Sequence, residues 1–210
     1  NIIFNDCNWE AAIDGVQLGI LFNQGQVCCA GSRVFVQEDI YDKFVAELVN
    51  AFQHINVGDP LNPETQMGAQ INRRQADKIL SYVQIAKEEG ATIACGGDYY
   101  TENGCEKGSF VQPTLITNVT NDMRVAQEEI FGPVAVVIKF KTEDEVIALA
   151  NQSTYGLGGA VCEVVAEAGK GKVKRVGIQD QFGQSAPYER LLAINGITVE
   201  NIVELAKGEW

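Results

Sequence analysis

The sequence is poor in the residues that metal and nucleic-acid sites require. His54 is the only histidine among 210 residues, and no CxxC or HxxxH spacing occurs. A zinc site is therefore not expected, because zinc ligands are mostly cysteine and histidine at such spacings. Basic residues are also few: 16 Lys and Arg stand against 28 Asp and Glu, a net charge of −12. Nucleic acid and anionic membranes reward a basic face, so neither is an expected partner.

Long apolar runs and a signal peptide are also missing. No apolar run approaches the roughly 20 residues of a membrane-spanning helix. A chain of this length that is 46% hydrophobic can bury a core without disulfides. We therefore interpret all six cysteines as reduced thiols and expect a cytoplasmic protein. They are Cys7, Cys28, Cys29, Cys95, Cys105 and Cys162.

Short apolar runs alternate with segments of helical period along the first 150 residues. This alternation predicts an α/β fold, with a mostly parallel sheet and helices on both faces. Thr142 and Glu145 have the spacing of a capping box at the start of a helix. The predicted strands are residues 2–4, 33–37, 92–95, 111–116 and 134–139, and the predicted helices begin near residues 9, 40, 72 and 142.

The pattern of apolar and polar residues changes after Cys162. Residues 156–161 predict one more strand, and residues 173–179 another. Two short helices are predicted over residues 187–194 and 198–207. We therefore divide the chain at residues 1–161 and 162–210, and expect the second part to complete the sheet of the first.

One segment carries small and polar residues around two adjacent cysteines. It runs Gly25-Gln26-Val27-Cys28-Cys29-Ala30-Gly31 and predicts a loop or a loop-to-helix junction. A thiol is nucleophilic only as a thiolate, which backbone N–H groups and partial exposure favour. On these residues alone two buried structural cysteines in a tight turn are the better interpretation, because free cysteine is among the most buried residue types.

Two motifs in this order closely resemble the aldehyde dehydrogenase family. The first is Phe22 to Arg33, in which the family's nucleophile corresponds to Cys28 and Cys29 is its neighbour. The second is Glu128-Glu129-Ile130-Phe131-Gly132-Pro133. The resemblance implies that Glu129 holds the nicotinamide ribose and Phe131 contacts the nicotinamide. It runs from residue 1 to about 161 and implies the fold of the family's catalytic domain.

The resemblance also implies a reaction. A thiolate adds to a carbonyl, hydride leaves to a cofactor, and the resulting thioester is hydrolysed. The backbone N–H of Cys28 would donate to the oxyanion. Val27, Cys28, Cys29 and Phe131 would then line the oxyanion and substrate pocket.

The family's Rossmann domain has no counterpart in these 210 residues. No GxGxxG follows a strand, so we expect no bound cofactor, and NAD or NADP only if the missing half is supplied. The end of the chain, including Asn195-Gly196-Ile197, resembles the C-terminus of a transketolase. The chain is therefore interpreted as a fusion of two gene fragments.

These observations favour a cofactor-independent ester hydrolase of the carboxylesterase type. Cys28 would be the nucleophile and Glu129 the base, although Glu129 as a remaining ribose ligand is an equal alternative. His54 is expected at a helix end rather than beside Cys28. The alternatives are an NAD(P)-dependent aldehyde dehydrogenase and an inactive remnant. The expected partners are a small ester or aldehyde and other copies of the chain, because a lost half would expose apolar surface.

Overall fold

The computed structural model describes residues 1–153 of the chain. Several sequence predictions lie outside the described residues. These are the strands at 156–161 and 173–179, the helices at 187–194 and 198–207, the division at residue 161, and the likeness of the tail to transketolase.

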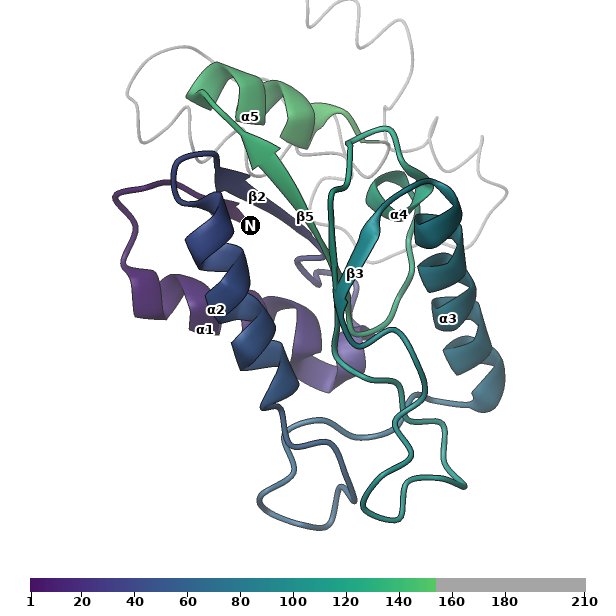
Figure 1. Cartoon of the computed structure of the whole chain (residues 1–210). Helices are drawn as coiled ribbons and strands as arrows, with labels where there is room; N and C mark the ends of the chain where they lie inside the picture. Colours follow the sequence, from purple (N-terminus) through teal and green to yellow (C-terminus); the bar gives the residue numbers. More distant parts are fainter. Residues whose placement is uncertain (154–210) are drawn as a thin grey trace, which may run out of the picture. The chain divides into compact units, whose positions relative to one another are not determined.

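A five-stranded sheet forms the centre of the described region, in the order β1-β2-β5-β4-β3 (Figure 1). All neighbours are parallel except β3 and β4, which confirms the predicted mostly parallel sheet. Residues 134–138 of β5 are all buried, as expected for an inner strand covered on both faces. The strands are β1 (Ile2–Ile3), β2 (Arg33–Gln37), β3 (Thr92–Cys95), β4 (Thr114–Thr117) and β5 (Val134–Phe140).

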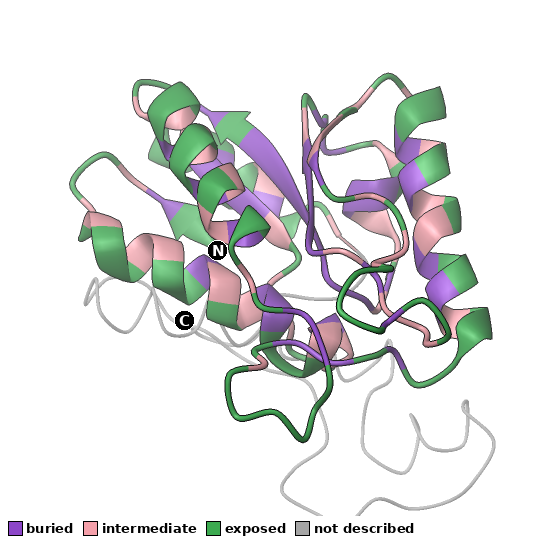
Figure 2. Cartoon of the chain, turned by 60° about the horizontal axis from the view of Figure 1, so that its bottom comes forward, coloured by how far each residue is buried: buried purple, intermediate pink, exposed green. Residues whose placement is uncertain are grey.

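Helices cover both faces of this sheet. Helices α1 (Trp9–Leu21) and α2 (Tyr41–Gln53) lie on one face, where Val34 and Val36 of β2 join their apolar residues in one buried core. Helices α3 (Arg73–Glu88) and α4 (Arg124–Gln127) lie on the other side (Figure 1). Figure 2 shows that the buried stripes of these helices face the sheet and the exposed stripes face outward.

The last described helix, α5 (Glu143–Asn151), is tied to the second face by Arg33. The guanidinium of Arg33 donates to the carbonyl oxygens of Leu149 at 3.3 Å and Ala150 at 3.0 Å. These are carbonyls of the last helical turn, which lack partners within a helix. Arg33 therefore fixes the end of α5 beside the start of β2.

Two local predictions need correction. The strand predicted from residue 111 begins instead at Thr114, because Pro113 has no N–H for a ladder hydrogen bond. The capping box at the start of α5 is only half formed. Thr142 Oγ1 accepts from the Glu145 N–H at 3.2 Å, but the Glu145 carboxylate accepts from the N–H of Lys141 at 2.7 Å rather than from Thr142.

Two further findings concern the described residues only. Each helix in residues 1–153 is too short or too polar to cross a lipid bilayer. The same residues hold no group of three or more His, Cys, Asp or Glu side chains arranged to bind a metal ion.

Candidate active site

The cysteine segment begins with three residues in a left-handed backbone conformation. After α1 a short 3-10 turn covers Phe22–Gly25, with φ of +47° at Asn23, +58° at Gln24 and +69° at Gly25. Asn and Gly tolerate this region better than other residues. The side chain of Asn23 also donates to the carbonyl of Gln26 at 3.2 Å, which helps to hold the reversal.

Cys28 and Cys29 occupy the two central positions of a tight turn. The turn is closed by the N–H of Ala30, which donates to the carbonyl of Val27 at 3.1 Å. Both cysteines are exposed and Val27 is half-buried. The backbone N–H groups of Cys28 and Cys29 donate to no atom within residues 1–153. The segment leads into β2, so the loop interpretation is confirmed and the helix junction is wrong.

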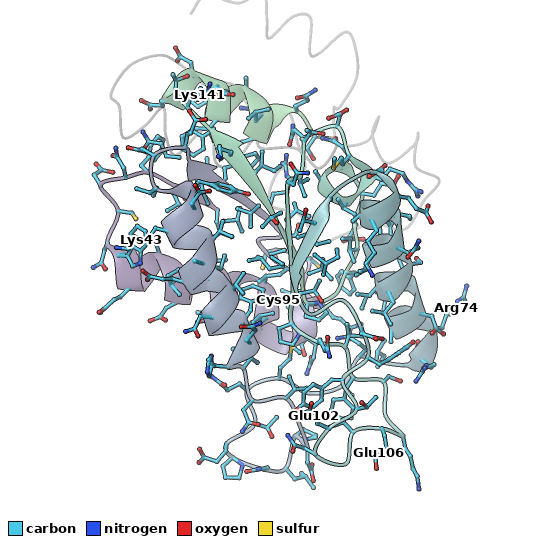
Figure 3. The ribbon with its side chains drawn as sticks, in the orientation of Figure 1. Lys43, Arg74, Cys95, Glu102, Glu106 and Lys141 are labelled. Atoms are coloured by element: carbon cyan, nitrogen blue, oxygen red, sulfur yellow. The ribbon has the colours of Figure 1, made fainter. Side chains whose placement is uncertain are left out.

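Other thiols of the described region have a different environment. Cys95 and Cys105 are buried, and burial raises the pKa of both thiols. Figure 3 shows Cys95 within the fold near the end of β3. The interpretation as two buried structural cysteines is therefore wrong for Cys28 and Cys29, which are both exposed.

The second motif lies directly before β5. Glu129 is exposed, and its carboxylate has no hydrogen-bond or ion-pair partner within residues 1–153. Phe131 is half-buried and has a φ of +61°, a strained value for an aromatic residue. The backbone carbonyl of Glu129 accepts a hydrogen bond from Lys78 Nζ at 3.1 Å.

Glu128 differs from its neighbour because its carboxylate is fully engaged. Arg124 donates to both of its oxygens, at 2.7 and 2.9 Å, and the hydroxyl of Tyr82 donates at 2.8 Å. These hydrogen bonds, from Arg124 first and then Tyr82, lower the pKa of Glu128 to about 2. Glu128 therefore has a structural role and leaves Glu129 as the free carboxylate of the pair.

The sheet brings the two motifs together. Strands β2 and β5 are parallel neighbours with Arg33 opposite Val136, so the segments that precede them meet at the same edge. Gly25 lies directly on the second motif: a Cβ at Gly25 would be 2.1 Å from the carbonyl oxygen of Gly132. The backbone of the cysteine segment is thus in contact with the backbone of the glutamate motif. Neither Gly25 nor Gly132 was assigned a role from the sequence, although both are glycines inside the motifs.

A cavity of about 520 Å³ lies away from these motifs. Its lining includes Tyr41 at the start of α2, Thr117 at the end of β4, and Lys139 near the end of β5. It therefore opens at the carboxyl ends of the parallel strands, whereas the two motifs precede the amino ends of β2 and β5. The chemistry-bearing residues are those of the motifs, so we assign the candidate site to them.

His54 takes no part in this site. Its Nδ1 donates to the carbonyl of Asn50 at 2.7 Å, one turn earlier at the end of α2. The predicted position at a helix end is confirmed.

Comparison with known proteins identifies the family. The sequence model of the aldehyde dehydrogenase family matches residues 1–170. The chain is 50% identical over 160 residues to a betaine aldehyde dehydrogenase of Brucella anthropi, and this covers 76% of the chain and 33% of that protein. The chain therefore spans about a third of the length of this curated relative.

Solved structures agree with this relationship. The betaine aldehyde dehydrogenase of Staphylococcus aureus, in complex with NAD+, is 46% identical, with a TM-score of 0.72 over 73% of this chain and 30% of that one. An aldehyde dehydrogenase of Bacillus cereus, also an NAD+ complex, is 46% identical with a TM-score of 0.71 over 75% and 31%. These matches confirm the α/β fold predicted from the resemblance.

The prediction of a cofactor-independent ester hydrolase is wrong, and so is the expectation of no cofactor. The relatives are dehydrogenases, and the solved ones are complexes with NAD+. The error has a chemical cause: acylation of a cysteine is common to esterases and dehydrogenases, so the cysteine motif alone does not separate them. The absence of a GxGxxG motif describes only these 210 residues and does not exclude a cofactor. The chain belongs to the aldehyde dehydrogenase family.

Proposed function

We propose that this chain supplies the nucleophile of an NAD+-dependent oxidation of aldehydes to carboxylic acids, with Cys28 as that nucleophile. The observation that carries the proposal is the position of Cys28, exposed in a turn that closely follows Gly25, whose backbone touches the glutamate motif. The names of the relatives suggest betaine aldehyde as the first substrate to test.

Cys28 acts as a thiolate that adds to the aldehyde carbon. The C–S bond forms as the carbonyl π bond opens, and the negative charge moves to the oxygen. The backbone N–H groups of Cys28 and Cys29, which have no acceptor within residues 1–153, are the candidate donors to that oxygen. Loss of hydride from the same carbon leaves a thioester on Cys28, and water then releases the carboxylic acid and the thiol. Val27 and Phe131 complete the proposed lining of the oxyanion and substrate pocket.

The residues of the second motif fit the nicotinamide end of NAD+, which accepts the hydride when bound. The carboxylate of Glu129 is exposed and unpartnered within residues 1–153, so it can accept hydrogen bonds from ribose hydroxyls. Phe131 offers an aromatic surface that is half-exposed. In this proposal Glu129 is a cofactor ligand rather than a catalytic base.

The complete reaction is a proposal for the chain together with whatever supplies the remaining cofactor contacts, because this chain spans about a third of its relative. A cytoplasmic location, assembly of several copies, and the transketolase-like tail remain predictions.

The decisive experiment combines oxidation with labelling. NADH formation from betaine aldehyde is measured for the chain, for Cys28→Ala and for the matched control Cys29→Ala. We expect Cys28→Ala to abolish oxidation and Cys29→Ala to retain most of it. Iodoacetamide should modify Cys28 at least tenfold faster than the buried Cys95 and Cys105.

Two results would refute the proposal. One is oxidation by Cys28→Ala at the wild-type rate. The other is an alkylation rate at Cys28 no higher than that at Cys95, which would instead indicate a folded remnant. Titration with NAD+ tests whether this chain can carry out the oxidation alone. The absence of saturable NAD+ binding would eliminate that possibility.

A further inference from the structure

Helix α3 presents one face to the glutamate motif. The residues of that face are spaced as one stripe of a helix, at positions i, i+3, i+4 and i+7. They contact residues 128–132 of the motif, so the helix runs alongside that segment. These residues are Gln75, Lys78, Ile79 and Tyr82.

Gln75 holds both peptide groups that flank Phe131. Its side-chain amide donates to the carbonyl of Ile130 at 3.2 Å and to the carbonyl of Phe131 at 2.9 Å. The two dihedral angles of Phe131 set the relative orientation of these two peptide planes. One amide that binds both carbonyls therefore favours the left-handed conformation of Phe131, which has a φ of +61°.

The position of Gln75 in its helix supports this role. Asn72 is the N-cap of α3, and its side chain accepts from the Gln75 N–H at 2.9 Å. Glutamine three residues after an N-cap commonly reaches back to the N-cap N–H in a capping box. Here the side chain of Gln75 bonds to Ile130 and Phe131 instead.

Contacts continue from α3 through the glutamate motif to the cysteine segment. A Cβ at Gly132 would lie 2.3 Å from Cδ1 of Ile79, so α3 touches the Gly132 backbone directly. The carbonyl of Gly132 in turn meets Gly25. Gly132 is therefore held between α3 and the segment that carries Cys28.

We propose that Gln75 is a positioning residue of the site, which fixes the left-handed backbone at Phe131 and thereby orients Glu129 and Phe131 toward the nicotinamide end of NAD+. This role rests on the proposed function for its cofactor part only. The backbone part is independent of any cofactor, because it depends on contacts among residues 75, 130 and 131.

The test uses Gln75→Glu in the full chain. Glutamate has nearly the same shape but cannot donate, and an acidic residue suits the first turn of a helix, so α3 itself is preserved. The matched control is Gln84→Glu on the same helix, where the wild-type side chain only donates to Glu88 at 2.9 Å on the surface.

The first measurement is amide hydrogen exchange. The amides of Val134 and Thr114 donate to the carbonyls of Gly132 and Pro133, both at 2.8 Å. We expect exchange at these two amides to accelerate about tenfold in Gln75→Glu and to be unchanged in Gln84→Glu, the effect of losing about one hydrogen bond. The second is the NAD+ dissociation constant, which should rise by a similar factor while the alkylation rate of Cys28 changes less than twofold. A general loss of structure would instead change the NAD+ dissociation constant and the alkylation rate of Cys28 together.

A double variant separates backbone positioning from simple destabilisation. Glycine adopts a positive φ without strain. In the Phe131→Gly background, Gln75→Glu should therefore have a much smaller effect on exchange at the Val134 amide than it has in wild type. Equal exchange in wild type and Gln75→Glu would overturn the positioning role. Accelerated exchange with unchanged, saturable NAD+ binding would overturn the cofactor part alone. Absence of NAD+ binding in wild type would count against the proposed function, and exchange would still decide the positioning role.

Discussion

At the scale of single residues, the two adjacent glutamates show how neighbours in a motif take different tasks. Glu128 is bound by Arg124 and Tyr82, whereas the carboxylate of Glu129 has no partner among the described residues. The sequence predicts a site role for Glu129 and none for Glu128. The structure adds a reason for Glu128: it holds the motif against α3 and α4.

The pKa of Glu128 predicts a pH-dependent contribution to stability. Its folded pKa is lowered from 4.5 to about 2, so the contribution is fully present above about pH 4.5 and is lost as the pH falls toward 2. The melting temperature of wild type should exceed that of Glu128→Gln at pH 7, and the difference should shrink between pH 4.5 and 2. The control Glu129→Gln should melt close to wild type at both pH values. A difference that is constant with pH would contradict the prediction.

The glycine pair Gly25 and Gly15 gives a second test at this scale. Gly25→Ala places a Cβ against the Gly132 carbonyl at a φ of +69°, and should destabilise the fold by about 1–3 kcal/mol. Gly15 lies in α1 with no atom near its Cβ position, so Gly15→Ala should stabilise by about 0.5–1 kcal/mol. Urea unfolding of the two variants measures both changes in the free energy of unfolding. Equal effects would show that the contact between the motifs has little energetic weight.

At the scale of elements, Arg33 connects β2 with α5. Its guanidinium is half-buried, and burial lowers its pKa. It donates to Leu149, Ala150 and the side chain of Asn121, and has no carboxylate partner within residues 1–153. The cation is therefore stabilised by helix carbonyls, which carry partial negative charge at a C-terminus.

Replacing Arg33 by lysine should loosen α5 specifically. Lysine has one donor group and cannot reach the same three oxygens in a fixed fork, so the loss should be about 1–3 kcal/mol. The control is Arg74→Lys, because Figure 3 shows the Arg74 side chain pointing from α3 into solvent. Thermal unfolding gives the stability of both, and hydrogen exchange should place the effect in residues 143–151. Indistinguishable stabilities of the two variants would contradict this role.

Local sequence rules predicted the elements well and the site only in part. Arg33–Gln37 and Thr92–Cys95 were predicted to the residue, because strand residues stand there between clear turn signals. The contact of Gly25 with Gly132 and the bonds of Gln75 were not predicted. They join segments far apart in the chain, and no local pattern encodes such a meeting. Only the resemblance to a family connected the two motifs in advance.

At the scale of the whole molecule, exposed apolar side chains predict self-association. Leu18 and Phe22 lie four residues apart at the end of α1, and are 68% and 64% exposed. Such neighbouring apolar surface favours contact with another chain. The double variant Leu18→Ser/Phe22→Ser should shift sedimentation toward the monomer. Leu61→Ser, at an 89% exposed loop residue, is the control. A wild-type chain that sediments as a monomer at every concentration would refute the prediction.

The meeting of Gly25 and Gly132 has a consequence for biosynthesis. The two glycines are about a hundred positions apart, and a ribosome needs roughly 5–20 s to add that many residues. During that interval the segment of Cys28 has been synthesised, while the Gly132 backbone that contacts it has yet to be made. A nascent chain arrested before residue 132 thus carries Cys28 without the backbone contact that supports the segment around it.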